Sequence, residues 1–119
     1  MIRCMFFMFN SNIFFNMNFS EILPILKDGA CCARTSSDFW RDKYIVMQIP
    51  AKISKDIVPR MTSLTDSAKM RIGTVGGGEI HYENQVLLLQ YKDDGATPTR
   101  ATYYQPTWDD ILAEDWVVV

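Results

Sequence analysis

Apolar side chains recur every three or four positions over residues 19–26, a spacing that places them on one face of a helix. Asn18 or Ser20 provides the polar cap that helices prefer before their first turn. The pattern therefore predicts a two-turn helix over residues 20–27. Pro24 fits this helix only within the first turn, because proline lacks the amide hydrogen that later turns use.

Five further stretches are typical of strands, because they alternate apolar with polar residues or are rich in aromatic and β-branched side chains. They cover residues 30–35, 44–49, 80–82, 85–91 and 99–104. Between the second and third of these, the spacing of Ile57, Met61 and Leu64 favours a helix over residues 64–71, with a short turn at residues 55–58.

Polar and glycine-rich segments separate the predicted elements. Residues 36–42 predict a loop that carries Trp40, and residues 93–95, Asp-Asp-Gly, have the chemistry of a turn. Three consecutive glycines, residues 76–78, could cradle a phosphate. However, strand-like sequence follows them instead of a helix, and no Lys-Ser/Thr pair is present, so we interpret them as a turn or loop.

The C-terminal segment combines a short helix with a final strand. Thr107, followed three residues later by Asp110, resembles a capping box, and Asp109 suits the positive end of the helix dipole. Residues 116–119, a tryptophan and three valines, predict a strand that is tied into the sheet or into a partner subunit. The elements together predict an α+β domain, with a small antiparallel sheet of about five strands and two or three short helices.

Composition and charge exclude several classes of protein. The chain has 119 residues, of which 48% are hydrophobic and 22% charged, as expected for one globular domain. Its net charge of −2 predicts no general attraction to nucleic acid or anionic lipid, so a phosphate-bearing ligand would need a local basic cluster. No apolar run approaches the ~20 residues that span a bilayer, and we expect no membrane partner.

Residues 1–16 have a composition of their own, dominated by Met, Phe, Ile and Asn. A secretory signal would use Arg3 as its charged end and residues 4–9 as its apolar core, but that core is short and no small-residue cleavage site follows. An extra edge strand, or an extension upstream of a start at Met17, agrees better with the composition. We therefore predict an N-terminal extension over residues 1–16 and a single domain over residues 17–119.

Cysteine and histidine offer little catalytic chemistry. Cys4, Cys31 and Cys32 form no CxxC pair, which favours a reducing, cytosolic compartment. Cys32 with His81, the only histidine, could serve as nucleophile and base, but a buried inert thiol is the usual outcome for such a cysteine. One histidine and a cysteine pair also leave too few ligands for a metal ion.

Four carboxylates near the C-terminus allow three interpretations. Asp109, Asp110, Glu114 and Asp115 could supply a general acid and base. Helix capping and solvent exposure explain two or three of them equally well. In the third interpretation, one of them accepts a hydrogen bond from a bound ligand.

The aromatic residues suggest a nucleotide site. Trp40 lies beside Arg41 and Lys43, and Trp108 begins the predicted C-terminal helix. A planar ring beside a cation offers a nucleotide both a face for its base and a partner for its phosphate. The alternative is that the tryptophans are core residues. We favour that alternative for Trp116 and leave it open for Trp40.

Both ends of the chain resemble a known family. Residues 17–29, followed by Ala33-Arg34 and Trp40, are similar to the opening of the phage Thoeris anti-defence family, type two. The ending Asp110-Ile111-Leu112-Ala113-Glu114-Asp115-Trp116 resembles the most specific motif of that family. The resemblance covers about residues 17–49 and 82–119, and the middle fits in outline like the longer members that carry an inserted segment.

The sequence departs from the family pattern at three places. The segment Phe39–Lys43 lacks the glycine that often precedes the tryptophan in the family, and Cys31-Cys32 stands where polar residues are common. Residues 1–16 have no counterpart in the family.

The resemblance implies a sponge rather than an enzyme, without metal or cofactor. Such proteins are typically homotetramers that capture, in the host cytoplasm, the cyclic ADP-ribose isomers made by Thoeris TIR proteins. Some members are also thought to hold cyclic dinucleotides of CBASS systems. The ligand-binding residues that we predict for this chain are Arg34, Trp40, Arg41, Lys43, Asn84, Tyr104, Thr107, Trp108, Asp109 and Asp110.

Two hypotheses from other functional classes compete with the sponge. In the first, the C-terminal carboxylates hydrolyse the signal molecule, which makes the protein an enzyme. In the second, an exposed aromatic surface binds and blocks a host defence protein without any nucleotide.

Overall fold

The computed structural model describes residues 16–119 and divides them into two compact units. One unit contains the described residues up to Gln48 together with Gln85–Val119, and the other is Ile49–Asn84. The predicted extension lies outside the described residues except for its last position, Asn16. No helix in the described part of the chain has the length and apolar character that a membrane crossing requires.

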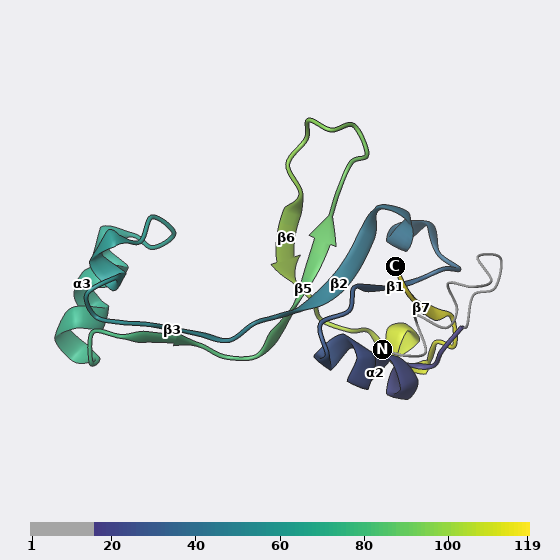
Figure 1. Ribbon diagram of the computed structural model, residues 1–119, viewed down its shortest axis with the longest axis horizontal. Helices are drawn as coiled ribbons and strands as arrows, with labels where there is room; N and C mark the ends of the chain where they lie inside the picture. The colour runs from purple at the N-terminus through teal and green to yellow at the C-terminus, as the bar shows by residue number, and fades with distance from the viewer. Residues whose placement is uncertain (1–15) are drawn as a thin grey trace. The chain divides into compact units, whose positions relative to one another are not determined.

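The first unit is built on a five-stranded antiparallel sheet, with the order β6-β5-β2-β1-β7 (Figure 1). Its strands are β1 (Cys32–Arg34), β2 (Lys43–Gln48), β5 (Gln85–Gln90), β6 (Arg100–Tyr103) and β7 (Trp116–Val118). Two helices belong to the same unit, α2 (Phe19–Lys27) and α4 (Trp108–Leu112). With α3 of the second unit, these elements confirm the predicted α+β class and a sheet of five strands.

Helix α2 forms where the sequence predicted it, with one difference. Asn18 caps it, because its side chain accepts from the Glu21 amide while Glu21 accepts from the Asn18 amide. Pro24, however, is the sixth residue of the helix, so the expectation that it lies in the first turn is wrong. The carbonyl that loses a partner there belongs to exposed Ser20, where water can replace the missing amide.

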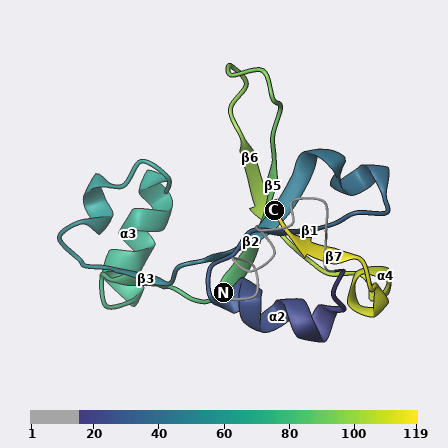
Figure 2. The ribbon, with the colours of Figure 1, turned by 45° about the vertical axis from the view of Figure 1, so that its right-hand side comes forward.

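The C-terminal strand holds the core together. Trp116 is fully buried, and its ring meets those of Trp40 and Phe19 edge to face, with centroids 5.2 and 5.7 Å apart. Strand β7 pairs with β1 along its whole length, and Trp116 also bridges to Met17. Figure 2 shows β7 beside α2 and α4. The prediction that the apolar terminus is tied into the sheet is confirmed, as is a core position for Trp116.

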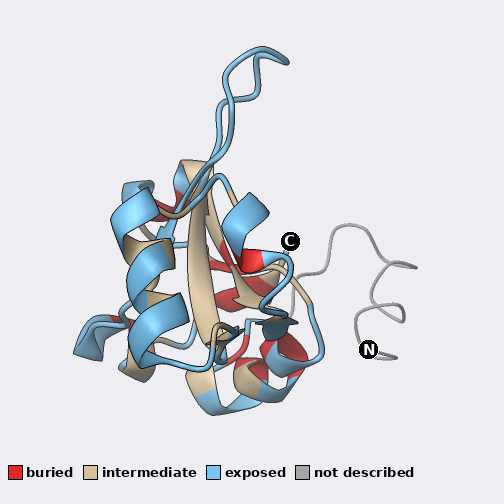
Figure 3. Ribbon diagram, turned by 90° about the vertical axis from the view of Figure 1, so that its left-hand side faces the viewer, coloured by how far each residue is buried: buried red, intermediate tan, exposed pale blue. Residues whose placement is uncertain are grey.

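A long loop connects β5 to β6. Its turn, predicted at residues 93–95, is held by Asp94, whose carboxylate accepts from the Thr97 hydroxyl and from the Ala96 and Thr97 amides at 2.6 to 2.9 Å. These hydrogen bonds lower the pKa of Asp94 to about 2. Figure 3 shows the loop exposed throughout, so its order comes from its own hydrogen bonds.

The second unit, Ile49–Asn84, is an insertion between two paired strands, since Gln48 and Gln85 are the last partners of β2 and β5. It contains a two-stranded ribbon of β3 (Ala51–Ile53) and β4 (Ile80–Tyr82), the 3-10 helix η2 (Val58–Arg60), and α3 (Asp66–Val75).

The sequence located this unit only in part. The helix predicted over residues 64–71 is α3, which starts behind its Thr65 cap, while the turn predicted at residues 55–58 falls mainly before η2. Strand β3 was not predicted, because Ala-Lys-Ile has no strand signal of its own and its partner β4 lies far along the chain.

Two tryptophans provide a test of the core. Trp116→Ala should lower the free energy of unfolding by ~3–5 kcal/mol, because a fully buried ring leaves a cavity. For a domain of this size, that corresponds to a melting temperature lower by more than about 10 °C. Trp108→Ala is the matched control. Trp108 is 74% exposed, so Trp108→Ala should change the free energy of unfolding by no more than about 0.5 kcal/mol. Calorimetry of both variants measures the difference.

Candidate functional site

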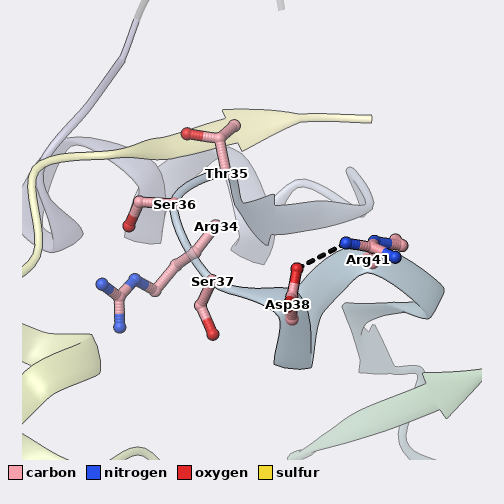
Figure 4. A pocket seen from close by; sticks show the side chains of 6 residues that line it. All are labelled: Arg34, Thr35, Ser36, Ser37, Asp38 and Arg41. Atoms are coloured by element: carbon pink, nitrogen blue, oxygen red, sulfur yellow. Dashed lines mark hydrogen bonds and ion pairs between the residues drawn. The ribbon is translucent and has the colours of Figure 1, made fainter.

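Two adjoining hollows share Arg34 and Ser37 in the first unit. The aromatic hollow encloses about 220 Å³ and is lined by Arg34, Ser37, Phe39, Trp40, Tyr104, Gln105, Thr107, Asp109 and Asp110. The hydroxyl hollow encloses about 390 Å³ and is lined by Arg34, Thr35, Ser36, Ser37, Asp38 and Arg41 (Figure 4). Segments far apart in the sequence therefore meet at one place, around the end of β1.

Arg34, the last residue of β1, is fixed between two carboxylates. Its Nη1 donates to Asp110 Oδ1 at 3.1 Å, and its Nε donates to Asp115 Oδ1 at 2.9 Å. Burial would lower the pKa of Arg34, but the hydrogen bonds and charges of the two aspartates outweigh burial and raise it. The guanidinium is thus a permanent, immobile cation at the boundary of the hollows.

Asp115 orients the loop that follows β1. Its second oxygen accepts from the Ser36 amide at 2.9 Å and from the Ser36 hydroxyl. Partial burial opposes ionisation of Asp115, yet the hydrogen bonds from Ser36 and Arg34 prevail and lower its pKa to about 2. Asp115 is therefore ionised at neutral pH, and it holds Ser36 in the lining of the hydroxyl hollow.

Asp110 is the one buried acidic side chain of the described residues, only 7% exposed. Besides Arg34, its carboxylate accepts from the Tyr104 hydroxyl at 2.7 Å and from the Thr107 amide at 3.3 Å. The last bond belongs to the capping box of α4, which confirms the predicted cap. Burial, followed by the hydrogen bond to Asp110, raises the pKa of Tyr104, so its hydroxyl remains protonated as a donor.

The 3-10 helix η1 (Asp38–Asp42) forms one wall of the aromatic hollow, where the sequence predicted a loop. Its Trp40 is only 4% exposed and meets Trp116 and Tyr104 edge to face, so the open question about Trp40 is answered by a core position. Successive residues of a 3-10 helix lie about a third of a turn apart. Phe39 consequently projects outward, 51% exposed, and lines the hollow.

The cations expected to meet phosphate are all paired within the chain. Arg41 contacts Asp38 in an exposed ion pair, and Figure 4 shows its guanidinium directed away from that of Arg34. Lys43 contacts Asp42 at 3.0 Å and lies 4.2 Å above the Phe39 ring. The exposed pair is weak and easily exchanged, whereas the two ion pairs of Arg34 are mostly buried.

The structure brings together most, but not all, of the predicted binding residues. The aromatic hollow gathers Arg34, Trp40, Tyr104, Thr107, Asp109 and Asp110. Arg41 lines the hydroxyl hollow, and Lys43 lies against Phe39 outside the lining. Trp108 lines neither hollow, although it is exposed, and Asn84 belongs to the second unit.

Sequence reasoning missed part of the lining, namely Thr35, Ser36, Ser37, Asp38, Phe39 and Gln105. Gln105 directly follows Tyr104, and the serines follow Arg34, so proximity to predicted residues was the available signal. Phe39 had no signal of its own, because the sequence cannot show which of two adjacent aromatic residues enters the core.

The residues considered for other chemistry lie elsewhere. Cys32 is fully buried in β1, as expected for an inert thiol, and His81 in β4 contacts Glu79 at 3.0 Å. Among residues 16–119, no group of three or more His, Cys, Asp and Glu side chains is arranged to hold a metal ion.

Comparison with protein-family models matches residues 17–119 to the Thoeris anti-defense 2-like domain. The match begins at Met17, the first residue of the predicted domain, and it includes the inserted unit. Comparison with curated protein sequences gave no significant match.

The pKa of Asp115 leads to a test by acid unfolding. Because this pKa, about 2, lies below the ordinary value of 3.8, the ionised carboxylate stabilises the fold above about pH 4, and this contribution is lost as the pH falls towards 2. Asp115→Asn should be less stable than the wild type at neutral pH and should lose less stability on acidification. Urea unfolding between about pH 6 and pH 2.5 measures both effects.

Asp109→Asn is the control, since Asp109 is an exposed neighbour of the same network and no hydrogen bond or ion pair of its side chain is found among the described residues. Its acid unfolding should follow that of the wild type. An Asp115→Asn profile that also parallels the wild type would contradict the assignment.

Proposed function

The chain belongs to the Thoeris anti-defense 2-like family, and on that premise we propose that it binds and sequesters a cyclic ADP-ribose-type immune signal without cleaving it. The family supports an anti-defence role in a bacteriophage. The observation that carries the finer proposal is the aromatic hollow, where aromatic rings and hydrogen-bonding groups surround a fixed guanidinium.

The lining suits the parts of such a ligand. Phe39 offers an exposed ring to an adenine base, the role that we first gave to Trp40. Gln105 and Asp109 can hydrogen-bond ribose hydroxyls. In the hydroxyl hollow, the serine hydroxyls can donate to phosphate, and Arg41 can exchange its exposed pairing with Asp38 for a phosphate oxygen.

The state of the carboxylates supports capture over hydrolysis. A general acid must be protonated in the resting enzyme, whereas Asp115 has a pKa of about 2 and is tied to Arg34 and Ser36. Asp110 is occupied by Arg34, Tyr104 and its own helix cap. Asp109 and Glu114 are exposed, but only Asp109 lines a hollow, and one carboxylate does not make an acid–base pair.

The charge balance supports a site completed by a second subunit. A cyclic ADP-ribose carries two phosphates, but Arg34, Arg41 and Lys43 each have a carboxylate partner in their own chain. Additional cations or backbone amides from a neighbouring copy would balance the ligand. We therefore retain the homotetramer that the family resemblance implied, with ligands held between subunits.

Phe39→Ala tests the stacking role. Stacking of a base on an aromatic side chain contributes ~1–3 kcal/mol, so calorimetry should show affinity for a cyclic ADP-ribose isomer weakened roughly 5- to 150-fold. The melting temperature should change little, because the ring is half exposed. Leu112→Ala removes another exposed apolar side chain, 71% exposed on α4 and outside both hollows, and should bind as the wild type does. Equal affinity of the two variants would remove Phe39 from the site.

Release of the ligand separates capture from cleavage. The protein is incubated with a cyclic ADP-ribose isomer, the filtrate is assayed for free ligand, and the protein is then denatured by heat. Depletion of the ligand from the filtrate, followed by recovery of the intact ligand, is the expected result.

A cleaved product would establish the hydrolase. If a parallel incubation depleted cyclic dinucleotides and left the cyclic ADP-ribose isomer free, the proposal would move to CBASS signals. Host-protein capture without any nucleotide bound would favour the protein-binding inhibitor.

A further inference from the structure

The hydroxyl hollow is surrounded by more negative than positive charge. Its lining contains two guanidinium groups, those of Arg34 and Arg41, and one carboxylate, that of Asp38. Arg34 also has two aspartate partners, Asp110 at 3.1 Å and Asp115 at 2.9 Å. Two arginines are therefore matched by three aspartates, and the surplus is one negative charge. A phosphate that enters this hollow meets a surplus of its own sign.

The three ion pairs of this group differ in how easily they exchange partners. The side chains of Arg34, Asp110 and Asp115 are between 10 and 17% exposed, so breaking their contacts would leave a mostly buried charge without a partner. The pair of Arg41 Nη2 with Asp38 Oδ1, at 2.5 Å, joins side chains that are 78% and 90% exposed. Exposed pairs contribute little to stability and are readily replaced. A phosphate can therefore reach the guanidinium of Arg41 by displacing Asp38.

Asp38 remains beside the phosphate after it is displaced. Asp38 and Arg41 are the first and fourth residues of η1, and a 3-10 helix has three residues per turn, so both side chains project from the same side. Figure 4 shows the Asp38 carboxylate directed at Arg41. The Ser37 hydroxyl accepts from the Phe39 amide at 3.1 Å, and no acceptor for its own hydrogen is found among residues 16–119. An anion held by Arg41 and Ser37 therefore lies close to the Asp38 carboxylate and is repelled by it.

The strength of this repulsion depends on the charge of the phosphate. A phosphate that bridges two groups, as in the pyrophosphate of a cyclic ADP-ribose, carries one negative charge. A terminal phosphate carries about −1.5 to −2 at neutral pH, because its second pKa is about 6. The terminal phosphate is also attracted more strongly by Arg41, but that attraction exists with or without Asp38. The carboxylate therefore shifts the balance in one direction, against terminal phosphates.

We propose that Asp38 is a specificity-determining residue, which shifts the preference of the hydroxyl hollow from terminal phosphates towards bridging phosphates. This role rests on the proposed function, because it places a phosphate of the signal against Arg41. The two hollows share Arg34 and Ser37, so a linear nucleotide such as ADP, with its adenine in the aromatic hollow, would bring its phosphates to the same place. A cyclic signal has no terminal phosphate, and Asp38 consequently disfavours its linear competitors.

The test compares two ligands on the full chain. Asp38→Asn removes the charge and keeps the size of the side chain. Calorimetry with a cyclic ADP-ribose isomer and with ADP gives the ratio of the two affinities for each protein. In Asp38→Asn the ratio should shift roughly two- to fourfold towards ADP, which is the effect of one additional charge on a carboxylate ~5–10 Å away in a solvent-exposed site. The shift should become smaller at high salt, because ions screen exposed charges.

Two variants serve as controls. Asp38→Glu keeps the charge and should keep the wild-type ratio. Asp66→Asn is the matched control in the second unit, because Asp66 also begins a helix behind a hydroxyl cap and pairs with a cation three residues later, Lys69 at 3.6 Å. Asp66 lines neither hollow, so its variant should bind both ligands as the wild type does. Both aspartate side chains are almost fully exposed, and all three variants should melt as the wild type does.

The outcomes separate the role of Asp38 from sequestration itself. If the wild type does not bind the cyclic ADP-ribose isomer, both proposals are overturned. If the wild type binds the isomer but Asp38→Asn leaves the ratio unchanged, only the role of Asp38 is overturned. The same conclusion follows if neither the wild type nor Asp38→Asn binds ADP at millimolar concentration, because the aspartate would then exclude nothing.

Discussion

One guanidinium connects the parts of the main unit. Arg34 extends from β1 and contacts Asp110 of α4 and Asp115 just before β7, 76 and 81 residues away in the sequence. Removing either carboxylate would leave a mostly buried charge with half its partners, a state that is strongly destabilising. The same contacts place the loop after β1, the short C-terminal helix and Tyr104 around the aromatic hollow. The scaffold and the candidate site therefore depend on the same ion pairs.

This dependence changes the meaning of the acidic C-terminal motif. Dense carboxylates suggest catalysis when only the sequence is considered, but here Asp110 closes a helix cap and Asp115 anchors the loop through Ser36. The ending Asp110–Trp116 thus includes two structural acids and a core tryptophan. In the proposed function, the ligand is contacted instead by nearby residues of the hollow, such as Asp109 and Gln105. The C-terminal ending therefore supports the hollow structurally, through the Asp110 and Asp115 contacts with Arg34.

Local signals were sufficient for most elements, and tertiary packing decided the rest. The Asn18 and Thr107 caps and the strand before the C-terminus follow from residues within a few positions of each other, and they were predictable. The burial of Trp40 instead of Phe39 depends on Trp116, far along the chain, and was not. Strand β3 requires its distant partner, and Pro24 is tolerated because water can reach the carbonyl above it. Six of the ten predicted binding residues line the aromatic hollow, because sequence neighbours of a motif also become its spatial neighbours.

The inserted unit begins and ends at one pair of residues in the sheet, because Gln48 of β2 is directly paired with Gln85 of β5. Their α-carbons are separated by only the ~5 Å between antiparallel partners, the distance that a tight hairpin would bridge. The entropic cost of closing a loop rises only slowly with its length. The paired strands β2 and β5 therefore place little constraint on the length of the segment inserted between Gln48 and Gln85. The insertion point can therefore accept segments of different length without disturbing the pairing of β2 with β5.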